Sequence, residues 1–263
     1  MSLVEQAVII RNEEIVPGYL ELELRAPGIA RQALPGQFIN IRVGSTLDPL
    51  LRRPFSVYDN DKNAGDITIL YKVVGRGTGM MAELDMGETL DVLGPLGRPF
   101  SLPENLQRVV LVGGGVGMAP LVYLARVSCE RGAAVTALVG ARTASELLGL
   151  NHLQGMGVKV MVTTDDGSQG IQGQVTDGLE PLLTESDYDF IYCCGPEPMM
   201  ARVADMAHRY GLKGEVALEE NMACGIGACL GCAHRVKQGQ DYSYVQICHE
   251  GPVFSMSEVV FDV

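Results

Sequence analysis

A β plus α/β fold in three parts is what the sequence predicts: a six-stranded antiparallel barrel, a doubly wound parallel sheet, and a small cysteine-rich module. Short runs that alternate apolar and polar residues between turn signals indicate the barrel. Solid, β-branched runs that alternate with helix-like segments indicate the parallel sheet. Residues 216–263 are rich in Gly and Cys and show little periodicity, so we expect them to depend on a metal centre for stability.

Residues 1–102 are expected to form the barrel. The alternation breaks at turn residues such as Pro17-Gly18 and Pro35-Gly36, which separate one short strand from the next. The expected strands cover residues 7–15, 19–25, 37–43, 55–58, 67–74 and 89–93. One short helix is expected over residues 79–84. Six strands at this spacing are typical of a small closed barrel.

Residues 103–215 are expected to form the parallel sheet, with strands at residues 109–112, 135–139, 158–162 and 190–193. Two turns connect such a strand to a helix, and they should lie at the carboxyl edge of the sheet, where ligands bind in such folds. One is Cys194-Gly195-Pro196, and the other contains Gly113, Gly114, Gly115 and Gly117 and leads into a helix to about residue 131. This glycine turn departs from the strict G-x-G-x-x-G dinucleotide pattern, because position 118 is Met, and fits a G-x-G-x-x-P variant.

Charge and composition exclude several classes of protein. The net charge of −12 argues against nucleic acid or an anionic membrane as a main partner. The N-terminus lacks the features of a signal peptide. The longest uncharged stretch, residues 109–125, contains glycines and a proline and is interpreted as strand, loop and helix rather than a membrane span. A cytoplasmic protein is therefore expected, whose seven cysteines serve in metal binding or catalysis rather than in disulfides.

Four cysteines with the spacing C-x4-C-x2-C-x15-C are the strongest functional signal. They are Cys224, Cys229, Cys232 and Cys248. This is the plant-type spacing of the ligands of a 2Fe–2S cluster, and Gly225, Gly227 and Gly231 would let the loop curl and point N–H groups at the sulfurs. Zinc is the alternative, although zinc sites usually present two separated knuckles. A Rieske centre does not fit because the second C-x-x-H is missing, so His234 and His249 are interpreted as neighbours rather than ligands.

Two weaker signals lie within the expected barrel. Arg53-Pro54-Phe55-Ser56 begins a strand, where an arginine by itself is more often a solvated charge. Leu70-Tyr71-Lys72 precedes a glycine-rich turn that contains Gly77 and Thr78 at the start of a helix. Such a helix N-terminus favours phosphate through its free N–H groups and dipole, although Thr78 could equally be an ordinary N-cap. The two signals in this order inside a small barrel are more specific than either alone.

Several motifs together resemble the ferredoxin–NADP reductase superfamily over residues 1–215. In order they are R-P-F-S, G-R-G-T, L-G-P-L-G at residues 93–97, G-G-G-V-G-M-A-P and C-C-G-P-E-P-M. Residues 219–232, which contain three of the four cysteines, narrow the resemblance to the electron-transfer subunits of class B dihydroorotate dehydrogenase. Residues 163–168 and 173–177 look like the middle region of those subunits.

The resemblance implies three cofactors: FAD, NAD and a 2Fe–2S cluster held by the four cysteines. FAD would be held by Arg53, Pro54, Phe55 and Ser56, by Leu70, Tyr71 and Lys72, and by Gly77 and Thr78. Arg53 and the Gly77-Thr78 turn suit the pyrophosphate, and the rings of Phe55 and Tyr71 suit a flavin or adenine. NAD would be bound by Gly113, Gly114, Gly115 and Gly117 and by Gly195 and Pro196. Cys194, the residue expected nearest the chemistry, would position the nicotinamide rather than act as a nucleophile.

A partner is also implied by the resemblance. It is an FMN-containing dihydroorotate dehydrogenase catalytic subunit, expected in a heterotetramer with two copies of each chain. Electrons would pass from its FMN through the cluster and FAD to NAD+ in pyrimidine biosynthesis. A flavin suits the middle position because it exchanges both hydride and single electrons. The three expected parts use up this chain and leave no domain to bind dihydroorotate.

Three points stay open in the sequence. Strand 135–139 is followed by Arg142 rather than by an acidic residue for a ribose hydroxyl, so NADP is possible even though the resemblance favours NAD. The chain could be the reductase subunit of another redox complex of the hydrogenase, oxygenase or transhydrogenase type. It could also be a non-catalytic, zinc-stabilised binding protein, which would lack flavin and iron–sulfur absorption bands.

Overall fold

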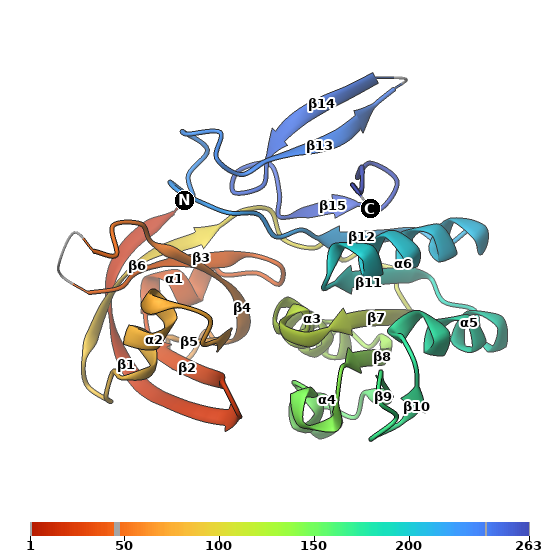
Figure 1. Ribbon diagram of the computed structural model, residues 1–263, viewed down its shortest axis with the longest axis horizontal. Coiled ribbons are helices and arrows are strands. Elements are labelled where there is room, and N and C mark those ends of the chain that lie inside the picture. Colours follow the sequence, from red (N-terminus) through yellow and green to blue (C-terminus); the bar gives the residue numbers. More distant parts are fainter. Residues whose placement is uncertain (1, 45–47, 240, 263) are drawn as a thin grey trace.

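A closed antiparallel barrel forms the N-terminal part of the computed structural model, which describes residues 2–44, 48–239 and 241–262 (Figure 1). Its strands run in the spatial order β1-β2-β5-β4-β3-β6. They are β1 (Leu3–Val16), β2 (Tyr19–Arg25), β3 (Phe38–Arg42), β4 (Arg53–Asp61), β5 (Asp66–Lys72) and β6 (Thr89–Leu96). The predicted six-stranded barrel is therefore confirmed. A short helix, α1 (Pro27–Gln32), was not predicted, because six residues beginning Pro-Gly carry no apolar periodicity.

Alternation along β5 shows how the barrel is filled and where its outer face packs. Ile67, Ile69 and Tyr71 belong to the barrel core. Leu70, between them, is 2% exposed and belongs instead to a core cluster shared with the following domain. The later half of the strand is therefore buried on both faces, which is why Ile69, Leu70 and Tyr71 follow one another without a polar residue between them.

Helix α2 (Arg76–Ala82) begins three residues earlier than the predicted helix 79–84. Gly75, with extended backbone, is the N-cap, and Thr78 is the third helical residue. The Thr78 hydroxyl accepts hydrogen bonds from the N–H groups of Gly75 at 3.2 Å and Val74 at 2.9 Å, so it ties the chain before the helix to the first turn. The interpretation of Thr78 as the N-cap residue was therefore wrong by one turn.

The second part is a seven-stranded sheet in the order β10-β9-β8-β7-β11-β12-β15. Its strands are β7 (Arg108–Gly114), β8 (Ala134–Ala141), β9 (Lys159–Thr164), β10 (Ile171–Gln172), β11 (Phe190–Cys194), β12 (Gly214–Ala217) and β15 (Val253–Ser255). All neighbours are parallel except β12 and β15, which are antiparallel. The doubly wound parallel sheet is confirmed, with one antiparallel edge strand added by the C-terminal segment.

Helices cover both faces of this sheet. They are α3 (Met118–Glu130), α4 (Leu150–Gly155), α5 (Val175–Glu185) and α6 (Glu197–Arg209), with the short turns η1 (Gly115–Gly117) and η2 (Ala144–Glu146). On β7, Val109 and Leu111 pack toward α3 and α4, whereas Val110 and Val112 pack toward α5 and α6. Among the described residues no helix is long and apolar enough to cross a membrane.

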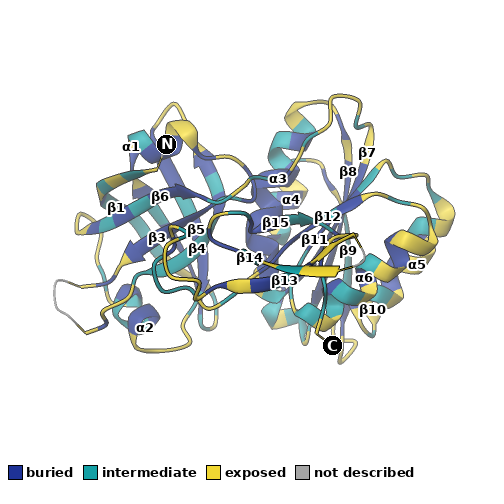
Figure 2. Cartoon of the chain, turned by 90° about the horizontal axis from the view of Figure 1, so that it is seen from above, coloured by how far each residue is buried: buried dark blue, intermediate teal, exposed yellow. Residues whose placement is uncertain are grey.

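The C-terminal part contains a hairpin of β13 (Ala233–Gln238) and β14 (Asp241–Gln246) and then returns to the sheet as β15. The sequence did not predict this hairpin, because its strands carry few buried apolar residues and half of their residues are exposed. Figure 2 shows the mixed burial of the two strands. The predicted boundary at residues 215 and 216 falls within β12. Since β15 pairs with β12, the C-terminal part is built onto the edge of the preceding sheet.

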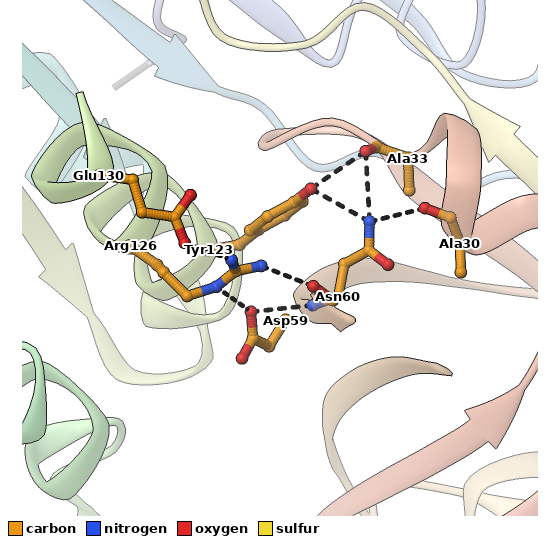
Figure 3. A network of polar contacts seen from close by, with 7 residues as sticks. All are labelled: Ala30, Ala33, Asp59, Asn60, Tyr123, Arg126 and Glu130. Atoms are coloured by element: carbon orange, nitrogen blue, oxygen red, sulfur yellow. Dashed lines mark hydrogen bonds and ion pairs between the residues drawn. The ribbon is translucent and has the colours of Figure 1, made fainter. Parts of the chain in front are cut away.

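Helix α3 also joins the barrel to the sheet through a polar network (Figure 3). The Tyr123 hydroxyl donates to the backbone carbonyl of Ala33 at 3.0 Å and accepts from Asn60 Nδ2 at 3.1 Å. Arg126 donates to Asp59 at 2.7 Å and to the carbonyl of Asn60 at 2.6 Å. These contacts fix the barrel against the helix that begins at the glycine turn.

Candidate cofactor sites

The predicted FAD residues Arg53 and Gly77 lie together at one end of the barrel. A Cβ built on Gly77 would stand 3.0 Å from Nε of Arg53, so the missing side chain leaves the space that the guanidinium occupies. Arg53 Nη1 donates to the carbonyl of Leu51 at 2.6 Å, which holds the side chain in this place. The arrangement brings a fixed cation beside the first turn of α2, as a pyrophosphate site requires.

The aromatic residues of the predicted FAD site do not both face outward. Tyr71 is 1% exposed, and its hydroxyl donates to Asn12 Oδ1 at 3.0 Å inside the barrel. Burial raises the pKa of Tyr71 to about 12. The ring of Phe55 meets Tyr71 edge-on at 5.8 Å between centroids and stays partly exposed. Of the two rings, only Phe55 has surface left for a flavin or adenine, so the expected ring contact from Tyr71 is not supported.

The other predicted FAD residues are placed unevenly. Pro54 and Ser56 are partly exposed on β4, whereas Leu70 is buried against the sheet domain. Lys72 ends β5, with its ammonium 4.8 Å from the ring centre of Tyr19. Leu70 could therefore offer a ligand only its backbone groups, while Pro54, Ser56 and Lys72 keep accessible side-chain surface.

A cavity of about 540 Å³ lies at the carboxyl edge of the sheet. Gly114 and Gly115 line it from the end of β7, and Pro196 lines it from the start of α6. Tyr19 and Lys72 reach it from the barrel. The sequence placed two ligand-binding turns at this edge, and the structure brings both to one cavity that also borders the barrel.

The glycines of the first turn serve two purposes. A Cβ on Gly113 would stand 2.0 Å from the sulfur of Met118, and one on Gly117 would stand 2.4 Å from the carbonyl oxygen of Cys194. These two glycines therefore permit close packing of β7, α3 and the second turn, and they do not line the cavity. Gly114 and Gly115 are the ones with access to a ligand.

The second turn packs tightly against the first. Gly195 has a φ of +156°, and a Cβ there would stand 3.1 Å from the backbone nitrogen of Gly114. Cys194, which precedes it, is partly buried, and burial raises the pKa of its thiol to about 12, with the Glu219 carboxylate adding to the shift. The thiol is protonated at neutral pH, which suits a positioning residue better than a nucleophile.

Two acidic residues in the cavity were missed from the sequence. Glu146 lies in η2 and Asp165 directly follows β9, and both line the cavity with Arg142. Arg142 donates from Nε to Glu146 at 2.9 Å and makes a second hydrogen bond to the same carboxylate, which lowers the pKa of Glu146. An acid that follows strand 135–139 directly is the local signal for a ribose hydroxyl, whereas Glu146 lies further along in η2 and Asp165 follows the neighbouring strand β9.

Three of the predicted cluster cysteines, Cys224, Cys229 and Cys232, lie in the loop between β12 and β13, and Cys248 lies in the turn between β14 and β15. Backbone N–H groups are turned toward all four sulfurs. Cys224 Sγ accepts from the N–H groups of Ile226 and Ala228 at 3.5 and 3.3 Å, and the first of these contributes most to lowering the pKa of Cys224 to about 6. Cys248 Sγ accepts from Gly227 at 3.2 Å. Cys229 and Cys232 each accept one backbone N–H at 3.4 Å. Backbone donors aimed at four thiols are what an anionic sulfur-ligated cluster requires.

Left-handed backbone makes this curl possible. Gly225 and Gly227 have φ of 70° and 79°, as the sequence suggested, and Leu230 has a φ of 60° despite its side chain. Cys224 lies beside Cys229, and Cys232 lies beside Cys248. No three His, Cys, Asp or Glu side chains in the described part of the chain form a cage for a single metal ion. The donor set and the backbone hydrogen bonds fit a 2Fe–2S group.

The cluster loop is also attached to both preceding domains. Cys232 and Cys248 are 2% and 3% exposed and belong to a core cluster that contains Phe38 of the barrel and Val216 of the sheet. Cys229 is exposed. The cysteine loop therefore packs on both the barrel and the sheet domain.

This fold, with these sites, is that of an oxidoreductase with FAD- and NAD-binding domains, and family models match each part. Residues 3–100 match an oxidoreductase FAD-binding domain and residues 111–205 an oxidoreductase NAD-binding domain. Residues 219–260 match the iron-sulfur cluster binding domain of dihydroorotate dehydrogenase B.

Whole-length relatives identify the family. The chain is 38% identical to the dihydroorotate dehydrogenase B (NAD(+)) electron transfer subunit of Desulforamulus reducens, with all of both chains covered. It is also 38% identical to the subunit of Geobacillus kaustophilus, over 97% of this chain and 98% of the relative. The chain belongs to the family of dihydroorotate dehydrogenase B electron transfer subunits.

Solved structures agree with this fold. A structure of an NADH-dependent reduced ferredoxin-NADP oxidoreductase, studied for flavin-based electron bifurcation, is similar with a TM-score of 0.86 and 33% identity, covering 98% of this chain and 91% of that one. The ferredoxin reductase of carbazole 1,9a-dioxygenase has a TM-score of 0.70 at 24% identity, covering 80% of this chain and 67% of that one, which shows a shared fold.

Proposed function

We propose that this chain passes electrons from an FMN-containing dihydroorotate dehydrogenase subunit to NAD+, through a 2Fe–2S cluster and FAD. One observation carries the proposal: the cysteine loop packs on both the barrel and the sheet domain, and the cavity at the sheet edge borders the barrel that holds the Arg53–Gly77 cradle. The family to which the chain belongs agrees with a role in electron transfer. FAD, when bound, supplies the conversion between hydride transfer and single-electron transfer.

The residues assigned to each cofactor follow from these positions. FAD is held by the guanidinium of Arg53, by the Gly77-Thr78 turn, by the surfaces of Pro54, Phe55, Ser56 and Lys72, and by the backbone of Leu70 and Tyr71. Gly114, Gly115 and Pro196 contact the nicotinamide nucleotide. Gly113, Gly117 and Gly195 keep that site in shape, and Cys194 positions the nicotinamide. Cys224, Cys229, Cys232 and Cys248 are the cluster ligands.

NAD rather than NADP is the proposed nucleotide. Arg142 could have held a 2′-phosphate, but both of its hydrogen bonds in the cavity go to Glu146. Asp165 adds a second carboxylate to the same wall. Two carboxylates suit the hydroxyls of an unphosphorylated ribose and repel a phosphate.

The partner is expected to bind where the cluster loop reaches the surface. Ile226 and Leu230 are 54% and 70% exposed, and Leu230 keeps its side chain outward in left-handed backbone. Such strain is typical of functional loops. We assign this apolar edge to the FMN-containing catalytic subunit, in a complex of two copies of each chain.

The proposed location is the cytoplasm. All seven cysteines are free, which suits a reducing compartment.

Reconstitution tests the proposal. The isolated chain, loaded with FAD and cluster, should oxidise NADH with an artificial acceptor and leave dihydroorotate untouched. Addition of the FMN-containing catalytic subunit should create dihydroorotate-dependent reduction of NAD+. Turnover of dihydroorotate by the chain alone would contradict the scheme, and so would a purified chain without flavin and iron–sulfur absorption bands.

A second candidate function is supported by the similar NADH-dependent reduced ferredoxin-NADP oxidoreductase. In that case the chain would be the NADH-handling part of a complex that exchanges electrons with ferredoxin and NADP. The same reconstitution separates the two. Activity that requires reduced ferredoxin and a different flavoprotein partner, with none from the dihydroorotate dehydrogenase subunit, would favour this second function.

A further inference from the structure

Asn40 is a buried polar residue between the barrel and the cysteine loop. It lies on β3 and is 1% exposed, and neither its Nδ2 nor its Oδ1 has a hydrogen-bond partner among the described residues. Buried side-chain amides in folded proteins are almost always hydrogen-bonded. A fully buried amide with both polar atoms unpartnered therefore points to a group that is bound in the working protein.

The amide faces the loop between β12 and β13, which holds three of the four cysteines. Figure 1 shows this loop passing over β3 and β6 on its way to β13. A Cβ built on Gly225 would stand 2.2 Å from Nδ2 of Asn40, so only a glycine lets the loop come this close. Gly225 directly follows Cys224, whose sulfur already accepts two backbone N–H groups. Asn40 thus meets the loop beside its first cysteine.

A residue assigned to FAD, Pro54, lies next to Asn40 on the same face of the sheet. Asn40 pairs with Pro54 across the ladder of β3 and β4, and directly opposite residues share one face of a sheet. Phe38, two residues earlier on the same strand, packs in the core cluster that contains Cys232 and Cys248. This face of β3 therefore lies between the strand assigned to FAD and the loop assigned to the cluster.

We propose that Asn40 is a positioning residue for the 2Fe–2S cluster, whose amide N–H donates a hydrogen bond to a sulfur of the bound cluster or of Cys224. The inference rests on the proposed function. The hydrogen bonds to the sulfurs seen within the loop come from its own backbone, whereas Asn40 reaches the site from the barrel. Hydrogen bonds to sulfur tune the potential of such clusters, and they stabilise the more negative, reduced form.

Redox titration of the loaded protein tests this role. Asn40→Leu and Asn40→Ala remove the amide, and Asn40→Ser keeps a hydroxyl donor. Asn60→Ala is the matched control, because Asn60 is a second buried asparagine of the barrel whose Nδ2 donates to Ala30, Ala33 and Tyr123 instead. The cluster is followed by electron paramagnetic resonance and FAD by its visible absorption, so each potential is measured separately.

The Leu and Ala variants should lower the cluster potential relative to FAD, shifting the distribution of the electron about tenfold, or ~59 mV for one electron. The Ser variant should restore part of the shift, and Asn60→Ala should leave the cluster potential at the parental value. If the Leu variant does not take up iron, the Ala and Ser variants carry the comparison.

Two results would overturn the inference: an unchanged cluster potential without the amide, or an equal shift in Asn60→Ala. Its failure is distinct from that of the proposed function. A parent protein that lacks flavin and cluster bands refutes the function, whereas a loaded parent whose potential ignores Asn40 refutes only the role of Asn40.

Discussion

Two faces of the barrel are joined to the rest of the chain in opposite ways. On the α3 face, the amide nitrogen of Asn60 donates to two backbone carbonyls and to the hydroxyl of Tyr123 (Figure 3). On the β3 face, the amide of Asn40 lies against Gly225 with no partner in the described chain. Both asparagines are buried, yet protein atoms satisfy the donor of only the first.

The difference shows which of the two contacts the polypeptide completes by itself. The first joint is the contact between the barrel and the sheet domain, and the second joint is the contact between the barrel and the cysteine loop. The joint between barrel and sheet domain is closed by side-chain and backbone hydrogen bonds, so the geometry between the proposed FAD and NAD sites is fixed by the chain itself. The joint between barrel and cysteine loop has donors aimed at sulfurs and an unpartnered amide. Its final order depends on what binds there, because metal binding and folding are coupled in such modules.

The largest expected effect comes from a substitution that disturbs only the cysteine loop. Cys229→Ala should abolish the absorption and paramagnetic signals of the 2Fe–2S cluster, because three thiolates cannot complete a four-thiolate site. Dihydroorotate-dependent NAD+ reduction with the partner should disappear with them. Oxidation of NADH with an artificial acceptor should persist, since it needs only the proposed FAD and NAD sites in the barrel and the sheet domain.

Cys129→Ala is the matched control. Cys129 lies in α3 and packs against the core of the sheet domain, far along the chain from the loop. This variant should keep the cluster and both activities. Unchanged iron and sulfide content in purified Cys229→Ala would refute the cluster assignment.

The next largest effect concerns the proposed FAD site of the barrel. Arg53→Ala removes the cation beside Gly77, and loss of a charge-assisted hydrogen bond costs on the order of 1.5–3 kcal/mol. We therefore expect FAD affinity to fall about 10- to 150-fold, measured by fluorescence of released flavin after dilution. Arg25→Ala, which removes a barrel arginine paired with Asp66, should retain FAD as the parent does. Equal retention by the two variants would show that the FAD cradle is misplaced.

The contrast between the joints also explains what the sequence could predict. Alternation in the barrel and solid runs in the sheet are local signals, and they predicted both architectures. The α3 contact depends on Tyr123 and Arg126 of one helix meeting Asn60, which is 63 positions before Tyr123, and all three are ordinary residue types. The pairing of β15 with β12 is equally non-local, so the sequence suggested a separate module where the structure has an edge strand.

The site residues also divide into those that a local sequence pattern predicted and those that only their surroundings in the fold reveal. The cysteine spacing is a local pattern, and backbone donors point toward the sulfurs of all four residues it identified, three in the loop before β13 and Cys248 just after β14. The four glycines of the first turn were predicted as one group, yet Gly113 and Gly117 are packing residues because Met118 and Cys194 occupy their Cβ positions. Tyr71 was expected to contact a flavin, but β5 alternation turns its ring into the barrel. Asn40 and Glu146 carry no motif and could be found only from their surroundings.

A smaller effect tests the polar network between α3 and the barrel. Tyr123→Phe removes a buried hydroxyl that donates to Ala33 and accepts from Asn60, and it leaves the Ala33 carbonyl with only the longer hydrogen bond from Asn60, at 3.4 Å. The free energy of unfolding in urea should fall by about 1–3 kcal/mol, while the cluster spectrum stays unchanged. Tyr210→Phe, at a site 38% exposed, should change it by less than about 0.5 kcal/mol. A matching loss in both variants would mean that the network adds nothing to the joint.

The smallest expected effect concerns Cys194, where the second nucleotide turn meets the sheet. Burial, together with the Glu219 carboxylate, raises the pKa of this thiol to about 12, above its usual value. A thiol whose pKa is raised keeps its proton up to a higher pH. At about pH 9, roughly one molecule in a thousand therefore carries the Cys194 thiolate. NADH oxidation with an artificial acceptor should therefore show no step from Cys194 between about pH 6 and pH 9. Cys194→Ser, which also keeps its proton there, should reproduce the parental profile with kcat/KM reduced by less than about tenfold. A titration step in the parent that vanishes in Cys194→Ser would show that the thiolate takes part in the reaction, and Cys194 would then be a reacting group rather than a positioning one.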